Sequence, residues 1–281
     1  MEKNVALVLS SGGARGLAHI GAIEELETQG YRITSIAGCS MGALIGGVYA
    51  AGKLEEFRAW MKTVDRKKML ELTDFSFSLN HIVKGTKIIE AIMEFVPDVR
   101  IEDLPIPYCA VATDWTTGRE VVMCKGSLFD AIRASISLPS FYEPVQRDGM
   151  ILIDGGVTNP IPLNRVVRTE GDILVGIDVS GHDYKAQSEI QHEIAEKRKH
   201  STSLSQQILN KLIPDNIDFN YYTMLSRVSS IMIRQNSLLM AQLTKPDVLV
   251  DIQMARYGGF DYDKSEKIIA IGRQKTQQTL K

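Results

Sequence analysis

Residues 35–47, Ser-Ile-Ala-Gly-Cys-Ser-Met-Gly-Ala-Leu-Ile-Gly-Gly, contain a G-x-S-x-G pentapeptide centred on Ser40. The apolar run at residues 33–37 predicts a buried strand before it, and the small residues after it predict a helix. The chain must turn sharply at Ser40, and Gly38 and Gly42 remove the Cβ atoms that would clash in such a turn. Ser40 is therefore predicted to stand at a helix N-terminus, a position that suits a nucleophile.

A second glycine-rich loop follows an apolar strand predicted over residues 5–9. It carries five candidates for holding an oxyanion or another anion: Gly12, Gly13, Ala14, Arg15 and Gly16. Adjacent glycines allow successive backbone N–H groups to point into one concavity, and we expect Arg15 either to brace the loop or to attract an anionic head group. A plain tight turn is the alternative. Nucleotide binding is disfavoured, because the loop reads G-G-x-x-G and no Gly-Lys-Ser/Thr follows it.

A nucleophilic Ser40 needs a general base, and the five histidines are poorly placed for this role. His19 falls inside the helix predicted after the first loop, and none of the others follows a strand as a triad histidine would: His81, His182, His192 and His200. A carboxylate is the better candidate. An apolar strand over residues 150–153 ends in Asp154-Gly155-Gly156, where the glycine pair permits an unusual backbone after the acid. Asp154 is therefore the predicted base, although Asp-Gly-Gly alone is equally typical of a simple turn.

Three motifs in this order resemble the patatin-like phospholipase family: the loop at residues 12–16, the pentapeptide at residues 38–42 and Asp154-Gly155-Gly156. Residues 135–144 look like the family's segment leading to the aspartate, and the resemblance extends over roughly residues 4–180. It implies an α/β hydrolytic domain, a catalytic dyad of Ser40 and Asp154, an oxyanion hole in the Gly12/Gly13 loop, and hydrolysis of lipid acyl esters. The backbone N–H of Met41 is a further candidate oxyanion donor. The structural glycines of the motifs are Gly38, Gly42, Gly155 and Gly156.

The rest of the sequence alternates predicted strands and helices, which favours a mostly parallel central sheet with helices on both faces, in three α/β/α layers. A length of 281 residues suits a single domain over residues 1–281. Residues 181–245 form a long helical excursion, for which a lid, a membrane-facing helix, a partner surface and packing on the core all stay open. Within it, the apolar run at residues 228–243 predicts a core helix, with a homodimer contact as the alternative. Basic and aromatic residues at 66–83 form a second candidate region for substrate access.

Composition excludes several other classes of protein. The formal net charge of −2 gives no reason to expect nucleic acid binding. Three cysteines are too few for a disulfide framework, and no His/Asp/Glu cluster has metal-ligand spacing, so neither a metal nor another cofactor is expected. The N-terminus lacks a signal-peptide pattern, and no apolar run reaches about 18 residues. We therefore expect a cytoplasmic protein, with peripheral contact at the inner membrane face as an option.

These observations predict a serine-dependent lipid acyl hydrolase of the phospholipase A, lysophospholipase or esterase type. Two alternatives use the same residues differently. An acyltransferase would pass the acyl group from Ser40 to an alcohol or a thiol instead of water. A non-catalytic sensor would only bind a lipid, although such a protein would need neither Ser40 nor Asp154 as a reactive group.

Overall fold

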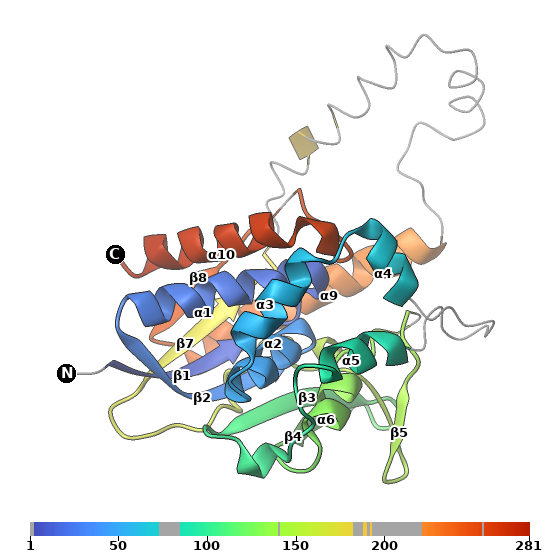
Figure 1. Ribbon diagram of the computed structural model, residues 1–281, viewed down its shortest axis with the longest axis horizontal. Coiled ribbons are helices and arrows are strands. Elements are labelled where there is room, and N and C mark those ends of the chain that lie inside the picture. The colour runs from blue at the N-terminus through green and yellow to red at the C-terminus, as the bar shows by residue number, and fades with distance from the viewer. Residues whose placement is uncertain are drawn as a thin grey trace.

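Figure 1 shows the computed structural model, which describes residues 3–72, 85–139, 141–181, 188, 189, 192, 221–254 and 256–281. The strands of these residues form one mixed sheet: β1 (Lys3–Leu9), β2 (Tyr31–Cys39), β3 (Tyr108–Asp114), β4 (Glu120–Met123), β5 (Val145–Arg147), β6 (Met150–Asp154), β7 (Ile173–Asp178) and β8 (Val248–Asp251). Hydrogen bonding links them in the order β5-β6-β3-β2-β1-β7-β8, and β4 pairs with β3 beside this path. β1, β2, β3, β7 and β8 run parallel, whereas β4 and β6 run antiparallel to β3.

Two strands meet end to end along one edge of β3. β4 pairs with residues 110–113 on one edge, and because β2 and β6 pair with some of the same residues, both must use the opposite edge. β2 runs parallel to β3 and ends with Cys39 opposite Val111. β6 runs antiparallel and ends with Asp154 opposite Ala112. The carboxyl ends of β2 and β6 therefore approach each other at neighbouring positions of β3.

Side chains of the strands alternate between two cores, as the pleat of a sheet requires. In β1, Leu7 enters the larger core and Val8 the smaller one. The larger core is covered by helices α1 (Ala18–Thr28), α2 (Met41–Ala50), α3 (Leu54–Lys62), α5 (Thr86–Met93), α6 (Leu128–Ser135) and α10 (Ser265–Thr279). The smaller core is covered by residues 161–166 and by α9 (Tyr221–Thr244), which contributes Met240 and Ala241. The sheet thus carries helices on both faces.

Short helices complete the described part of the chain: η1 (Gly13–Leu17), α4 (Arg66–Leu72), η2 (Ile101–Asp103), η3 (Gly155–Val157) and η4 (Tyr262–Lys264). Within these described residues, no helix combines the length and the apolar character needed to cross a membrane. The second access region is only partly described, because residues 73–84 lie outside the described residues. The same holds for most of the excursion at residues 181–245, of which chiefly α9 is described.

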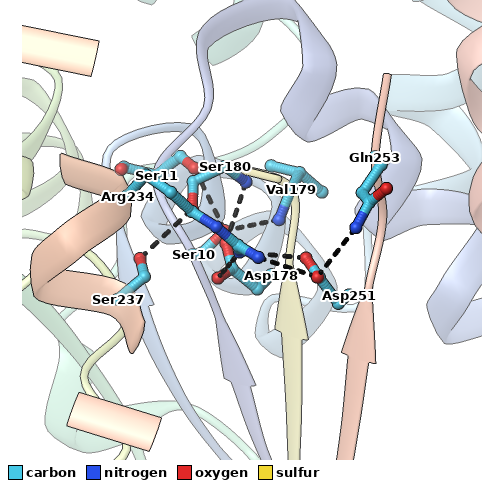
Figure 2. A network of polar contacts seen from close by, with 9 residues as sticks. All are labelled: Ser10, Ser11, Asp178, Val179, Ser180, Arg234, Ser237, Asp251 and Gln253. Carbon is cyan, nitrogen blue, oxygen red and sulfur yellow. Dashed lines mark hydrogen bonds and ion pairs between the residues drawn. The ribbon is translucent and has the colours of Figure 1, made fainter. Parts of the chain in front are cut away.

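The predicted fold class is confirmed: the sheet is mostly parallel and lies between helices. Ser40 and Asp154 both lie at the carboxyl ends of strands in this sheet, although β6 runs antiparallel to β3 and its end meets that of β2. One expectation needs correction, namely that residues 228–243 form a core helix. They belong to α9, where Met240 and Ala241 pack on the smaller core, but much of the other apolar surface is exposed and Arg234 also faces the protein (Figure 2).

Candidate active site

The sharp turn between β2 and α2 fixes Ser40 in an unusual backbone conformation, with φ of 54° and ψ of −122°. The two flanking glycines are needed because other backbone atoms occupy the space of a side chain. A Cβ on Gly38 would lie 2.4 Å from the carbonyl oxygen of Gly42, and one on Gly42 would lie 2.2 Å from that of Leu9. The pentapeptide therefore presses the start of α2 against the ends of β1 and β2, with Ser40 at the apex.

Ser40 and Asp154 are in direct contact. The Ser40 Oγ donates a hydrogen bond of 2.6 Å to Oδ2 of Asp154, and the backbone N–H of Gly156 donates one of 2.7 Å to Oδ1. The pairing of the strands explains this contact, because the end of β2 places Ser40 and the end of β6 places Asp154 beside neighbouring residues of β3. Residues predicted from two separate motifs thus form one hydrogen-bonded pair.

Burial changes the acidity of Asp154. Its side chain lies in the interior, and Ser40 is also buried. Removal from water raises the pKa of Asp154 to about 6, although the hydrogen bonds from Ser40 and Gly156 favour the ionised form and oppose this shift. At neutral pH the carboxylate is therefore ionised, and it is a stronger base than an aspartate in water.

Ser135, at the end of α6, holds the backbone of Ser40 in place. Its Oγ accepts a 2.9 Å hydrogen bond from the backbone N–H of Ser40 and donates one of 2.6 Å to the carbonyl oxygen of Val111. The hydroxyl thus ties the strained turn to β3. Sequence reasoning recorded Ser135 only as part of a family segment, because nothing in its local pattern shows that it contacts a residue 95 positions away.

Backbone contacts fix Asp154 in a similar way. Its N–H donates to the carbonyl oxygen of Ser137 at 2.9 Å, and its own carbonyl oxygen accepts from the Thr113 hydroxyl at 3.0 Å. The following glycine is required here, since a Cβ on Gly155 would lie 2.2 Å from the carbonyl oxygen of Val111. Asp154 therefore has little freedom to move away from Ser40.

The first glycine-rich loop lies against the start of α2. A Cβ on Gly16 would lie 2.3 Å from Cγ of Met41, so the loop and the residue after Ser40 are in close contact. Gly13 adopts a φ of +56°, which favours glycine, and the N–H of Ala14 donates to the carbonyl oxygen of Gly259 at 2.8 Å. Ala14 is thus engaged within the fold. Gly12 lies against the residue that follows β7, since a Cβ on Gly12 would lie 2.3 Å from Cγ2 of Val179.

Arg15 lies within this loop, and Ser11 directly precedes it. Burial lowers the pKa of Arg15, while the charge of Asp178 raises it, and the Arg15 Nε has no hydrogen-bond partner among the described residues. Its contact with an anionic head group stays a prediction. The buried Ser11 hydroxyl also lacks a partner within the described part of the chain. A Cβ on Gly156 would lie 3.2 Å from this hydroxyl and 3.0 Å from Oδ1 of Asp154, so Ser11 borders the carboxylate. Sequence reasoning gave Ser11 no role.

Histidine has no part in the described pair. The buried His19 ring places Nε2 at 2.8 Å from the carbonyl oxygen of Ser10, so Nε2 carries the hydrogen, and burial lowers the His19 pKa to about 4. His192 is exposed, and the remaining histidines lie outside the described residues. Over the ranges described, no group of three or more His, Cys, Asp and Glu side chains could hold a metal ion.

Comparison with known proteins identifies the family. The family model for "Patatin-like phospholipase" matches residues 7–167, which is more than half of the chain and includes Ser40 and Asp154. An uncharacterized NTE family protein of Mycobacterium bovis is 46% identical over 179 residues, covering 64% of this chain and 50% of that protein. The neuropathy target esterase sws of Drosophila melanogaster is 32% identical over 187 residues, covering 64% of this chain and 13% of that protein.

The matched region thus spans about half the length of the mycobacterial relative and a small part of the fly protein. Among solved structures, VipD from Legionella pneumophila aligns with 14% identity and a TM-score of 0.48, over 99% of this chain and 66% of that chain. Because the family model matches residues 7–167, this chain belongs to the patatin-like phospholipase family.

Proposed function

We propose that this protein is a serine-dependent acyl hydrolase that cleaves carboxylic ester bonds of lipids. The observation that carries the proposal is the 2.6 Å hydrogen bond between Ser40 Oγ and Asp154 Oδ2. The family supports the lipid substrate, since its description is that of a phospholipase and one relative is named an esterase. A carboxylate at hydrogen-bond distance can act as the base that accepts the proton of a serine hydroxyl during attack.

In the proposed acylation step, Ser40 Oγ attacks the ester carbonyl carbon while Asp154 takes the hydroxyl proton. The tetrahedral intermediate then collapses, Asp154 returns the proton to the leaving alcohol, and an acyl-Ser40 ester remains. In deacylation, Asp154 accepts a proton from a water molecule that attacks this ester. The carboxylic acid is released and Ser40 regains its hydrogen.

The oxyanion of the intermediate requires hydrogen-bond donors close to Ser40. The backbone N–H groups of Gly12, Gly13 and Met41 are the proposed donors. Met41 begins α2, where the first N–H groups have no partner within the helix. The N–H of Ala14 is left out of this set, because it already donates to Gly259. Removing one such donor typically slows catalysis by about 10²–10³.

The test is hydrolysis of a medium-chain p-nitrophenyl ester by wild type, Ser40→Ala and Asp154→Asn. We expect both variants to lose activity by orders of magnitude. Ser127→Ala is the matched control, because Ser127 caps α6 away from the pair and its loss affects stability but removes no reacting group. Activity that survives in Ser40→Ala would contradict the proposal. Adding an alcohol acceptor and analysing products separates hydrolysis from acyl transfer.

A further inference from the structure

Two of the three cysteines stand opposite each other where β3 and β4 pair (Figure 1). The ladder of these antiparallel strands pairs Ala110 with Met123. One step further along both strands, Cys109 lies opposite Cys124, the residue that directly follows β4. The Cys109 side chain is buried, whereas Cys124 is exposed. The proposed hydrolytic mechanism uses neither residue.

Both side chains point to the same face of the sheet. Cys109 belongs to the smaller core, and Val122 packs against that core. Because side chains alternate along a strand, Cys124, which comes two residues after Val122, points the same way as Val122. The acidity of Cys124 agrees with this placement, since the Cys109 thiol has the largest effect on the Cys124 pKa. The two thiols are therefore neighbours.

The hydrogen-bond pattern of the ladder shows that the backbone spacing suits a disulfide. The N–H of Asp114 donates to the carbonyl oxygen of Arg119 at 2.9 Å, so these two residues form a hydrogen-bonded pair. The two kinds of pair alternate along an antiparallel ladder, and Cys109 lies an odd number of residues before Asp114. Cys109 and Cys124 thus occupy a non-hydrogen-bonded pair, in which the Cα atoms are about 4.5 Å apart and the side chains are close. A disulfide needs a Cα separation of about 4.4–6.8 Å, which this pair already has.

Cys124 is the more reactive thiol of the pair. The hydrogen bond from Cys109 lowers the Cys124 pKa, partial burial opposes this effect, and the charge of Lys125 supports it, so that the pKa is about 7. The thiolate is the form of cysteine that attacks oxidants, and an exposed thiolate next to a second cysteine is the usual arrangement of a redox-sensitive site. Cys39 differs in both respects, because it is buried and its burial raises its pKa well above the ordinary value.

We propose that Cys109 and Cys124 form a thiol oxidation site that reacts with hydroperoxides and closes to a reversible disulfide. With hydrogen peroxide, the Cys124 thiolate attacks one oxygen, the O–O bond breaks, and Cys124 becomes a sulfenic acid while hydroxide leaves. The Cys109 sulfur then attacks the sulfenic sulfur, the S–O bond breaks, and the hydroxyl leaves with the Cys109 proton as water. Two thiols are thus oxidised to a disulfide and one peroxide is reduced to water. This chemistry does not depend on the proposed hydrolase.

The experiment treats the reduced, full-length protein with a small molar excess of hydrogen peroxide and then blocks the remaining thiols with N-ethylmaleimide. Intact-mass spectrometry counts the blocked thiols, and tryptic mapping without reductant locates any disulfide. Trypsin cleaves after Arg119, between the two cysteines, so that their peptides separate unless a disulfide joins them. Cys124→Ser removes the exposed sulfur and Cys109→Ala removes its neighbour, while Cys39 serves as the internal control.

We expect oxidised wild type to keep only the Cys39 thiol and to yield the joined peptides of Cys109 and Cys124, and dithiothreitol should restore all three thiols. In Cys124→Ser, the buried Cys109 should oxidise slower by about tenfold or more. In Cys109→Ala, oxidation should stop at a Cys124 sulfenic acid that dimedone traps.

Three results would overturn the proposal. They are oxidation of Cys124 in wild type without linkage to Cys109, a disulfide that joins Cys124 residues of two molecules, and undiminished oxidation of Cys109 in Cys124→Ser. Cys109→Ala removes atoms from the smaller core and so tests only the intermediate. The decision rests on wild type and on Cys124→Ser, which changes an exposed residue.

Discussion

Replacing Asp154 by Asn should stabilise the folded protein at neutral pH while it abolishes the proposed activity. Asn has nearly the same shape as Asp and suits the hydrogen bonds of the site. Its Oδ1 can accept from the N–H of Gly156, and its Nδ2 can donate to Ser40 Oγ, which then acts as an acceptor. The substitution therefore removes a buried charge and keeps a hydrogen-bonded contact at each of the two side-chain positions.

The size of the effect follows from the pKa of Asp154. Burial raises this pKa from an ordinary 3.8 to about 6. At about 1.4 kcal/mol per pH unit, keeping Asp154 ionised costs the folded state about 3 kcal/mol. Between the two pKa values the folded protein binds more protons at this position than the unfolded chain does, so wild-type stability falls as pH rises. The favourable contribution of protonated Asp154 is complete below the unfolded pKa and is lost as pH rises through about 6.

The assay is urea unfolding of wild type and Asp154→Asn over a range from about pH 3.5 to about pH 8. The unfolding free energy of the variant minus that of wild type should rise by about 3 kcal/mol across this range. Asp148→Asn is the control for replacing an aspartate by an asparagine at an exposed position, since the Asp148 side chain is 78% exposed. A difference that does not change with pH, or one that falls as pH rises, would refute the inferred desolvation of Asp154.

Three further changes test other parts of the account. Ser135→Ala should lower kcat of ester hydrolysis by about tenfold to a hundredfold with little change in KM, because the nucleophile loses its backbone anchor; an unchanged kcat would exclude this positioning role. Gly42→Ala should cost about 3 kcal/mol in urea unfolding, whereas Gly259→Ala, whose Cβ would meet no atom within 4 Å, should be close to neutral; equal stabilities would contradict the packing of the turn. Arg234→Met should cost about 3–5 kcal/mol because it leaves Asp178 buried without its partner, and a cost below about 1 kcal/mol would speak against this ion pair.

The residues of the candidate site could be predicted because their motifs reflect local backbone geometry. The glycines around Ser40 and after Asp154 stand where a Cβ would strike a carbonyl oxygen, and such a requirement is visible in a short stretch of sequence. The direction of β6 could not be predicted. An apolar run such as residues 150–153 indicates a buried strand, but it carries no information on whether that strand runs parallel or antiparallel to its neighbour.

Contacts between distant segments also could not be predicted from the sequence. The contact of Ser135 with Ser40 is a hydrogen bond across the fold, and the position of Ser11 beside the carboxylate depends on its closeness to Gly156. The error on α9 has a specific cause. Helical periodicity shows that apolar residues share one side, but it does not show which side faces the protein. In α9 the side that carries Arg234 faces the protein, since Arg234 pairs with carboxylates at the ends of two strands.

Covalent labelling tests the proposed Ser40/Asp154 dyad most directly. A fluorophosphonate reacts with a serine only where a base and oxyanion donors activate it. The account predicts that intact-mass spectrometry of wild type will show one added phosphonyl group, that peptide mapping will locate it on Ser40, and that Asp154→Asn will label far more slowly. A label on any other residue, or undiminished labelling of Ser40→Ala, would contradict it.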